Sequence, residues 1–103
     1  MLGMSDYDGY ATLVMPDGSE KVLRFGLSIV RGSEVEPSHW NGTVDADRQM
    51  LISAMESSFS LTLRMPNGRE GQLMIDHVDD EIDENGTSWA RVAGVGDAPF
   101  GPA

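Results

Sequence analysis

A duplicated hairpin pattern constrains the fold of this chain more than any other feature. The segment from Thr12 to Leu23 returns as the segment from Thr62 to Leu73, at an offset of 50 residues and with seven of twelve positions identical. Each copy alternates apolar and polar residues, reaches a short turn and alternates again, which is typical of two antiparallel strands joined by a hairpin. The sequence therefore predicts two similar hairpins.

Proline and glycine mark the turn of each hairpin. Pro16 and Pro66 preset the φ angle of the first turn position, and Gly18 and Gly68 accept the left-handed conformation that a β-carbon disfavours. A type I turn with a one-residue bulge at each glycine fits this spacing. We expect these four residues to act as structural turn residues.

The remaining segments predict two more strands and one helix. With the hairpins included, we expect strands near residues 10–15, 20–32, 39–44, 59–65, 71–78 and 88–94. Asp45 is a suitable N-cap for a helix over about residues 46–56, whose apolar side chains fall on one stripe. Leu73, Ile75 and His77 are in phase and are expected on one face of the fifth strand.

The order of these elements predicts a mainly β fold. Three strands, a short helix and three strands, with two similar hairpin halves, favour a six-stranded antiparallel barrel or sandwich with internal pseudo-symmetry. At 103 residues the chain is expected to form a single domain, 1–103. Its expected parts are the first half, the linking helix, the second half and an irregular tail, at residues 9–45, 46–57, 59–95 and 96–103.

The composition excludes several functional classes. Seventeen acidic and seven basic residues give a formal charge of −10, which disfavours binding to nucleic acid and to anionic lipid. The chain has no cysteine, so disulfides, thiol catalysis and thiolate metal sites are absent, as is usual in a reducing compartment. No apolar run approaches the roughly 20 residues of a membrane helix. We therefore expect a cytoplasmic protein.

Five short motifs occur in a recognisable order. They are residues 7–11 (YDGYA), 36–42 (EPSHWNG), 45–47 (DAD), 61–68 (LTLRMPNG) and 91–100 (RVAGVGDAPF). In this order they resemble a family of small actinobacterial domains of uncharacterised function, found alone or at the C-terminus of flavin-dependent monooxygenases of the Baeyer–Villiger type. The chain departs from the family in the shorter loop between Pro37 and His39 and in the acidic turn at 79–85, which replaces a segment expected to contain Pro-Trp.

The resemblance implies the same β fold, a bacterial cytoplasmic setting and a functional association with a flavin-dependent monooxygenase. It implies no catalytic residue and no cofactor, because the family has no assigned activity.

Three residues are candidates for ligand binding: His39, Trp40 and His77. A histidine can titrate or donate a hydrogen bond, and a tryptophan offers a flat apolar wall. Alternation places His39 and Trp40 on opposite faces of their strand, and a tryptophan on a short central strand is usually core. The two histidines with Asp76 would make a two-histidine, one-carboxylate metal site, but chance explains these three residues far more readily.

The acidic segment after residue 78 holds three candidate metal ligands: Asp79, Glu81 and Asp83. Glu81, Asp83 and Asn85 stand at alternate positions, as ligands do in a calcium-binding EF-hand loop. The match is incomplete, because the first ligand of such a loop is normally Asp and because Val92 stands where a bidentate glutamate is required. A weak divalent-ion site and a solvated hairpin tip are the two interpretations.

These observations favour a non-catalytic β-domain, with no catalytic residue and no cofactor, that binds a protein partner or a small ligand. A barrel of about six strands has room for little besides its own side chains, which favours the protein partner. A homodimer through open strand edges is a further hypothesis. The alternatives are a small acidic inhibitor that occludes a basic site, and an enzyme whose pocket joins His39, His77 and a carboxylate.

Overall fold

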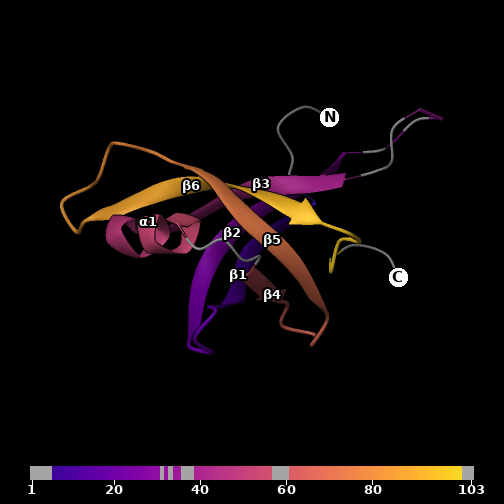
Figure 1. The fold of residues 1–103 in the computed structure, drawn as a ribbon, viewed down its shortest axis with the longest axis horizontal. Coiled ribbons are helices and arrows are strands. Elements are labelled where there is room, and N and C mark those ends of the chain that lie inside the picture. Colours follow the sequence, from indigo (N-terminus) through magenta and orange to yellow (C-terminus); the bar gives the residue numbers. More distant parts are fainter. Residues whose placement is uncertain (1–5, 31, 33, 36–38, 57–60, 101–103) are drawn as a thin grey trace.

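The computed structural model describes residues 6–30, 32, 34–35, 39–56 and 61–100. These residues form six antiparallel strands, closed into a barrel, and one short helix (Figure 1). The elements in chain order are β1 (Tyr7–Val14), β2 (Glu20–Val30), β3 (His39–Asp47), α1 (Arg48–Glu56), β4 (Leu61–Arg64), β5 (Glu70–Val78) and β6 (Thr87–Val95). The prediction of an antiparallel barrel or sandwich is confirmed, and of the two the structure is a closed barrel. No helix in the described part of the chain is long and apolar enough to cross a membrane.

The two hairpins have the same register. Val14 pairs with Glu20 in the first hairpin, and Arg64 pairs with Glu70 in the second, 50 residues later. Around the barrel the strands follow the order β1-β2-β3-β6-β5-β4. The barrel closes where β1 meets β4 in three pairs centred on Leu13 and Leu63, which are equivalent positions of the two copies. The hairpins are thus related by a local two-fold axis through this leucine pair.

This closure pairs part of the strand edges on which the predicted homodimer depends. The dimer requires strand edges left open by the two hairpins. In the barrel, β1 and β4 pair with each other at residues 12–14 and 62–64. Those residues are not open to a second copy of the chain, and the homodimer stays a prediction.

Both hairpin turns have the predicted geometry. Gly18 N donates to Met15 O at 2.9 Å, Met15 N donates to Ser19 O at 2.8 Å, and Gly18 has a φ of +89°. The second turn repeats both hydrogen bonds 50 residues later, and Gly68 has a φ of +92°. Each turn is therefore a type I turn with a bulge at its glycine.

A side-chain oxygen supports each of these turns. Asp17 Oδ1 accepts hydrogen bonds from Ser19 Oγ at 2.7 Å and Ser19 N at 2.9 Å, and together they hold the pKa of the Asp17 carboxyl below its usual value. Asn67 Oδ1 accepts the equivalent bond from the backbone two residues later, at 3.0 Å. Pro16 and Pro66 precede these residues and are exposed.

Apolar side chains fill the barrel. Every strand contributes to a single cluster of buried residues: Ala11, Leu13, Phe25, Leu27, Trp40, Val44, Ala46, Leu51, Ala54, Leu61, Leu63, Met65, Leu73, Ile75, Val78, Ala90, Val92 and Phe100. The helix α1 lies across one end of the barrel, contacts β5, β6 and β3, and contributes Leu51 and Ala54 to this core (Figure 1). Because side chains fill the interior, a binding site is expected on the outer surface of the barrel.

Trp40 is the largest fully buried side chain, with an exposure of 1%, as expected for a core tryptophan. Its indole packs directly on Gly94, where an added Cβ would lie 1.9 Å from Trp40 Cε2. Phe100 covers the indole edge-on, with ring centroids 5.6 Å apart at 82°. Phe100 therefore packs against the core of the domain. Trp40 Nε1 has no hydrogen-bond partner among the described residues.

The tail that carries Phe100 has no regular secondary structure in residues 96–100. Pro99 packs on the backbone of β5, where a Cβ on Gly71 would lie 2.8 Å from the proline ring. Arg69 Nη2 donates to Ala98 O at 3.3 Å. The tail is thus fixed against the second hairpin.

The start of the helix differs from the prediction. β3 continues to Asp47, which pairs with Thr87, and α1 begins at Arg48. The N-cap is Asp47, whose Oδ2 accepts a hydrogen bond from Met50 N at 3.1 Å, and not Asp45. Alternating burial extends the strand by three residues, so that Asp45 lies on the outer wall.

A β-bulge corrects the predicted phase of His77. The register shifts between Ile75 and His77, so the burial alternation breaks at this point of β5. Leu73 and Ile75 are buried as expected, whereas His77 is exposed. The bulge therefore turns His77 to the outer wall.

Replacing Gly18 with Val should lower the free energy of unfolding by about 1–2 kcal/mol, because a β-branched residue is strained at this positive φ. Nothing lies within 4 Å of the added Cβ, so the loss comes from the backbone conformation alone. Gly18→Asn, which tolerates the same φ, is the matched control and should be nearly neutral. Equal melting temperatures for the Val and Asn variants would contradict the turn assignment.

Replacing Gly94 with Ala should cost about 1–3 kcal/mol, because the methyl group would overlap the ring of Trp40 beneath Phe100. Denaturant unfolding measures this loss. Val95→Ala at the exposed neighbouring position is the control and should change stability by less than about 0.5 kcal/mol. A Gly94→Ala protein as stable as the control would show that the two residues are not packed together.

Candidate functional site

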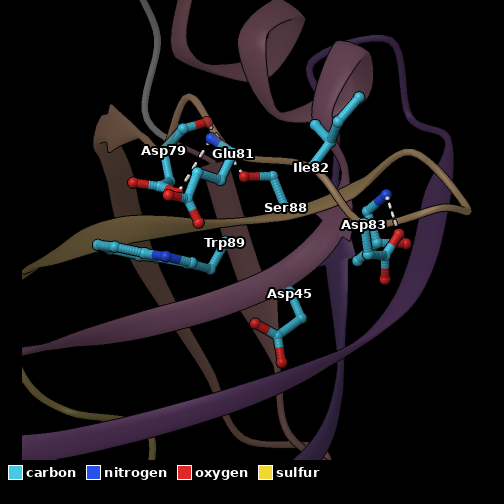
Figure 2. Close-up of a pocket in the computed structure, with 8 residues that line it drawn as sticks. Asp45, Asp79, Glu81, Ile82, Asp83, Ser88 and Trp89 are labelled. Atoms are coloured by element: carbon cyan, nitrogen blue, oxygen red, sulfur yellow. Dashed lines mark hydrogen bonds between the residues drawn. The ribbon is translucent and has the colours of Figure 1, made fainter.

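A hollow of about 410 Å³ opens on the outer wall beside the turn between β5 and β6 (Figure 2). It combines one exposed aromatic ring with several carboxylates. The residues that line it are Asp45, Asp79, Glu81, Ile82, Asp83, Thr87, Ser88 and Trp89.

The pairing of β3 with β6 places Trp89 in this hollow. Val44 pairs with Ala90, and both side chains point into the core. Asp45 pairs with Trp89 one position away, so both side chains point outward. Trp89 is 41% exposed. In the close-up its ring lies between Asp45 on one side and Asp79 and Glu81 on the other (Figure 2).

The turn between β5 and β6 is a third copy of the type I turn with a glycine bulge. Gly86 N donates to Asp83 O at 3.0 Å, Asp83 N donates to Thr87 O at 2.9 Å, and Gly86 has a φ of +80°. Asp83 Oδ1 accepts hydrogen bonds from Asn85 N at 2.8 Å and Thr87 N at 2.9 Å. One oxygen of Asp83 therefore supports the turn.

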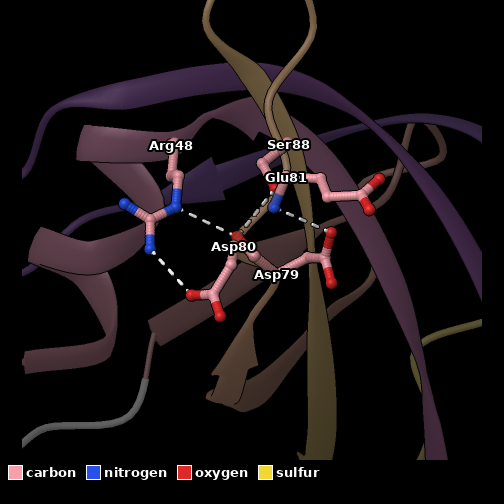
Figure 3. A network of polar contacts seen from close by, with 5 residues as sticks. All are labelled: Arg48, Asp79, Asp80, Glu81 and Ser88. Atoms are coloured by element: carbon pink, nitrogen blue, oxygen red, sulfur yellow. Dashed lines mark hydrogen bonds and ion pairs between the residues drawn. The ribbon is translucent and has the colours of Figure 1, made fainter.

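A polar network anchors residues 79–81, which border the hollow, to the helix α1 (Figure 3). Asp79 O accepts hydrogen bonds from Arg48 Nε at 3.0 Å and Ser88 Oγ at 3.1 Å. Arg48 Nη2 also forms an ion pair with Asp80 at 3.3 Å. Glu81 N donates to Asp79 Oδ2 at 3.1 Å. These contacts fix the backbone that carries Asp79 and Glu81 beside Trp89.

The carboxylates of the hollow differ from the other acidic residues in their ion pairing, although one of them, Asp45, lies opposite Arg24 in the β2–β3 pairing. Five acidic residues elsewhere form ion pairs with arginines: Asp8, Glu20, Glu70, Asp76 and Asp80. Within the described residues, no ion pair involves any of the four carboxylates that line the hollow. The hollow therefore concentrates negative charge next to an aromatic face.

The two histidines lie in different surroundings. His39 is exposed and lines a small hollow of about 70 Å³ with Ile29, Trp40 and residues 96–98. His77 lies beside Trp89 on the outer wall, with ring centroids 6.1 Å apart at 60°. None of the three predicted ligand-binding residues lines the acidic hollow: His39 and Trp40 share the small hollow, and His77 only contacts the ring of Trp89.

The candidate metal ligands Asp79, Glu81 and Asp83 all line the hollow. However, the described residues contain no group of three or more His, Asp or Glu side chains placed to hold a metal ion. His39, His77 and Asp76, the other predicted metal site, also do not form such a group in the described part of the chain. Asp79 and Asp83 instead direct oxygens at backbone N–H groups of their own turn.

Trp89 and Asp45 were not among the residues predicted for a functional site. The alternation of β6 could have indicated the exposure of Trp89. Ser88, Ala90 and Val92 share one face of the strand, and Trp89 lies on the other. If the small and aliphatic residues face the core, the tryptophan faces outward. Asp45 was interpreted as a helix cap, which concealed its place on the wall.

Comparisons with known proteins identify no relative. No family model, curated protein or solved structure matches the chain. The resemblance to the actinobacterial domain family therefore stays a prediction.

Proposed function

We propose that this protein is a non-catalytic cytoplasmic binding module that holds a protein partner on its outer wall. The contact surface, which we call the Trp89 wall, consists of the outward-facing residues Asp45, Met74, His77, Trp89 and Arg91. It spans β3, β6 and β5, which are neighbours in the barrel.

The exposure of Trp89 is the observation that carries this proposal. Tryptophan is a large apolar side chain that is usually buried, and the other tryptophan of the chain is 1% exposed. Tryptophan and arginine are also the residue types most enriched among the residues that dominate protein–protein affinity. An indole that is 41% exposed beside a hollow supports a role as the anchor of an interface.

The register makes the Trp89 wall continuous. Asp45 pairs with Trp89, and Arg91 pairs with His77 on the other side of β6. Met74 is half-exposed and pairs with Ala93, which lies two residues beyond Arg91 on β6. Arg91 is held to Asp76 by an ion pair of 2.9 Å, which orients its side chain along the wall. These residues form one patch with an aromatic centre and a charged rim, as interfaces do.

The filled barrel supports a binding surface outside the fold. Leu13, Phe25, Trp40, Leu63 and Leu73 occupy the interior and have essentially no exposure. A six-stranded barrel packed in this way has little room for a ligand, so the wall is the favoured location.

A small acidic inhibitor is the second candidate, because the unpaired carboxylates of the hollow would also attract a basic active site. The two proposals differ in what the partner loses. Binding of an inhibitor abolishes the activity of its target, whereas binding of a module leaves that activity in place.

Photo-crosslinking tests the proposed surface. A photoreactive phenylalanine analogue at Met74 should give one discrete heterologous crosslink in the native cells, and Trp89→Ala in the same chain should reduce it at least fivefold. The analogue at Val22, exposed on β2, is the matched control and should give none. A flavin-dependent monooxygenase is the first partner to test, on the basis of the resemblance.

Equal crosslinking from Met74 and Val22, no crosslink from Met74, or a crosslink indifferent to Trp89→Ala would contradict the proposal. A product of twice the chain mass would contradict it as well, because it would identify a second copy of this chain as the occupant. Circular dichroism verifies that the Trp89→Ala protein is folded.

A further inference from the structure

We propose that Asn85 is a site of spontaneous deamidation, where the folded protein converts an asparagine into isoaspartate and aspartate. The chain contains three Asn-Gly steps, at residues 41–42, 67–68 and 85–86. Glycine has no β-carbon to obstruct the attack of its own backbone nitrogen on the preceding side chain. All three steps are therefore reactive in an unfolded chain, and the fold decides which of them reacts in the native protein.

The reaction needs water as its only co-reactant. The backbone nitrogen of Gly86 attacks Cγ of Asn85, a bond forms between these two atoms, and the bond between Cγ and Nδ2 breaks. The attacking nitrogen loses its proton and the side-chain nitrogen leaves as ammonia, so that a five-membered succinimide ring remains. Water then opens the ring at either carbonyl. The chain continues through the α-carboxyl as aspartate or through the β-carboxyl as isoaspartate.

The fold blocks this reaction at Asn41. Asn41 and Gly42 lie within β3, and each pairs with a residue of β2 on one side and a residue of β6 on the other. A Cβ placed on Gly42 would collide with Gly26 O, so the backbone at this step is tightly enclosed. Closure of the succinimide ring requires Asn41 to leave the extended conformation of a strand, and both neighbouring strands oppose that change.

The second hairpin turn restrains Asn67. Its Oδ1 accepts a hydrogen bond from Arg69 N at 3.0 Å, which fixes the orientation of the amide side chain. The turn is joined directly to a strand ladder, because Arg64 pairs with Glu70 and their side chains form an ion pair of 2.9 Å. Gly68 N is itself hydrogen-bonded across the turn. Attack by this nitrogen therefore requires the loss of several contacts at once.

The side chain of Asn85 is held less firmly than that of Asn67. Asn85 is exposed, and its side-chain amide makes no hydrogen bond within the described residues. Its backbone N–H donates to Asp83 Oδ1 at 2.8 Å. An exposed side chain without such a bond exchanges between its staggered rotamers, and Cγ can thus approach Gly86 N.

The third turn also stands apart from the strand ladder. The pairing of β5 with β6 ends at Val78 and Ala90, so residues 79–86 project beyond it, and residues 80–85 are exposed (Figure 1). Gly86 N donates to Asp83 O at 3.0 Å, and this bond must break before the nitrogen can attack. Opening an exposed turn beyond the end of a ladder costs less free energy than opening one that continues it. The structure thus favours reaction at Asn85 over Asn67.

Isoaspartate at position 85 alters a segment that holds the helix. Gly86 O accepts a hydrogen bond from the backbone nitrogen of Arg48, the first residue of α1, at 3.0 Å. Isoaspartate inserts a methylene group into the backbone immediately before Gly86. Aspartate keeps the backbone length, and Asp17 occupies the equivalent position of the first turn. We therefore expect the isoaspartate form to loosen the start of α1 and the aspartate form to keep the native structure.

Peptide mapping of the aged full-length protein tests the site. The folded protein is incubated at mildly alkaline pH, digested and analysed by mass spectrometry with electron-transfer fragmentation, which distinguishes isoaspartate from aspartate. We expect conversion of Asn85 at least fivefold faster than conversion of Asn67, with Asn41 unchanged over the same period. In the urea-denatured chain the difference between Asn85 and Asn67 should fall below twofold.

Two variants test whether opening of the turn controls the rate. Asp83→Ala removes the carboxylate that accepts hydrogen bonds from Asn85 N and Thr87 N, so it should speed conversion of Asn85 at least threefold. Glu84→Gln is the matched control, because it removes a neighbouring charge and leaves the hydrogen bonds of Asp83 in place. It should change the rate by less than twofold. An intact Asn41 shows in every sample that the barrel has stayed folded.

Conversion of Asn67 or Asn41 as fast as that of Asn85 in the folded protein would overturn this proposal. An Asn85 that stays intact while the denatured chain reacts would overturn it as well. Equal acceleration by Asp83→Ala and Glu84→Gln would also contradict it, because charge and not the opening of the turn would then control the rate.

Discussion

The pairing of β3 with β6 is the interaction on which the rest of the structure depends. It joins the two halves of the chain across the barrel and fixes which side of each strand faces the core. Because side chains alternate along a strand, a shift of one residue would exchange the inner and outer faces. The observed register sends Trp40 inward onto Gly94 and sends Trp89 outward beside Asp45. One tryptophan therefore stabilises the fold, and the other is left for recognition.

The two ends of this pairing have different tasks. At one end, Trp40, Gly94 and Phe100 form a tight apolar contact that leaves no space for a side chain at position 94. At the other end, the strand passes into α1, whose first residue, Arg48, holds the acidic turn through Asp79 O. The turn places Glu81 beside Trp89 (Figure 2). A rigid core and a helix-anchored turn thus present an acidic, aromatic surface with little ordering needed on binding, which favours affinity.

The sequence predicted the fold well and the site only in part. The repeated hairpins predicted the barrel because Gly18, Gly68 and the alternating runs are local signals with a direct physical meaning. The acidic turn was recognised as a candidate site, but its third copy of the glycine-bulge turn was missed, since Glu84 stands where the other two turns have proline.

Two residues were misplaced for different physical reasons. The bulge that exposes His77 leaves no mark in the alternation of the sequence. Asp45 matched a helix cap equally well, and only the pairing with β6 shows that the strand continues past it. Trp89 could have been found from alternation alone, whereas its acidic neighbours come from other elements and required the fold.

The most direct test of this account is hydroxyl-radical footprinting of the protein in its own cells and after purification. We expect oxidation of Trp89 to fall at least threefold in cells relative to the purified protein, because the partner covers the Trp89 wall. Tyr10, which is 61% exposed on β1, should be oxidised equally in both samples. Equal oxidation of Trp89 in both samples, or protection of Tyr10 in its place, would contradict the claim that this wall is the binding surface.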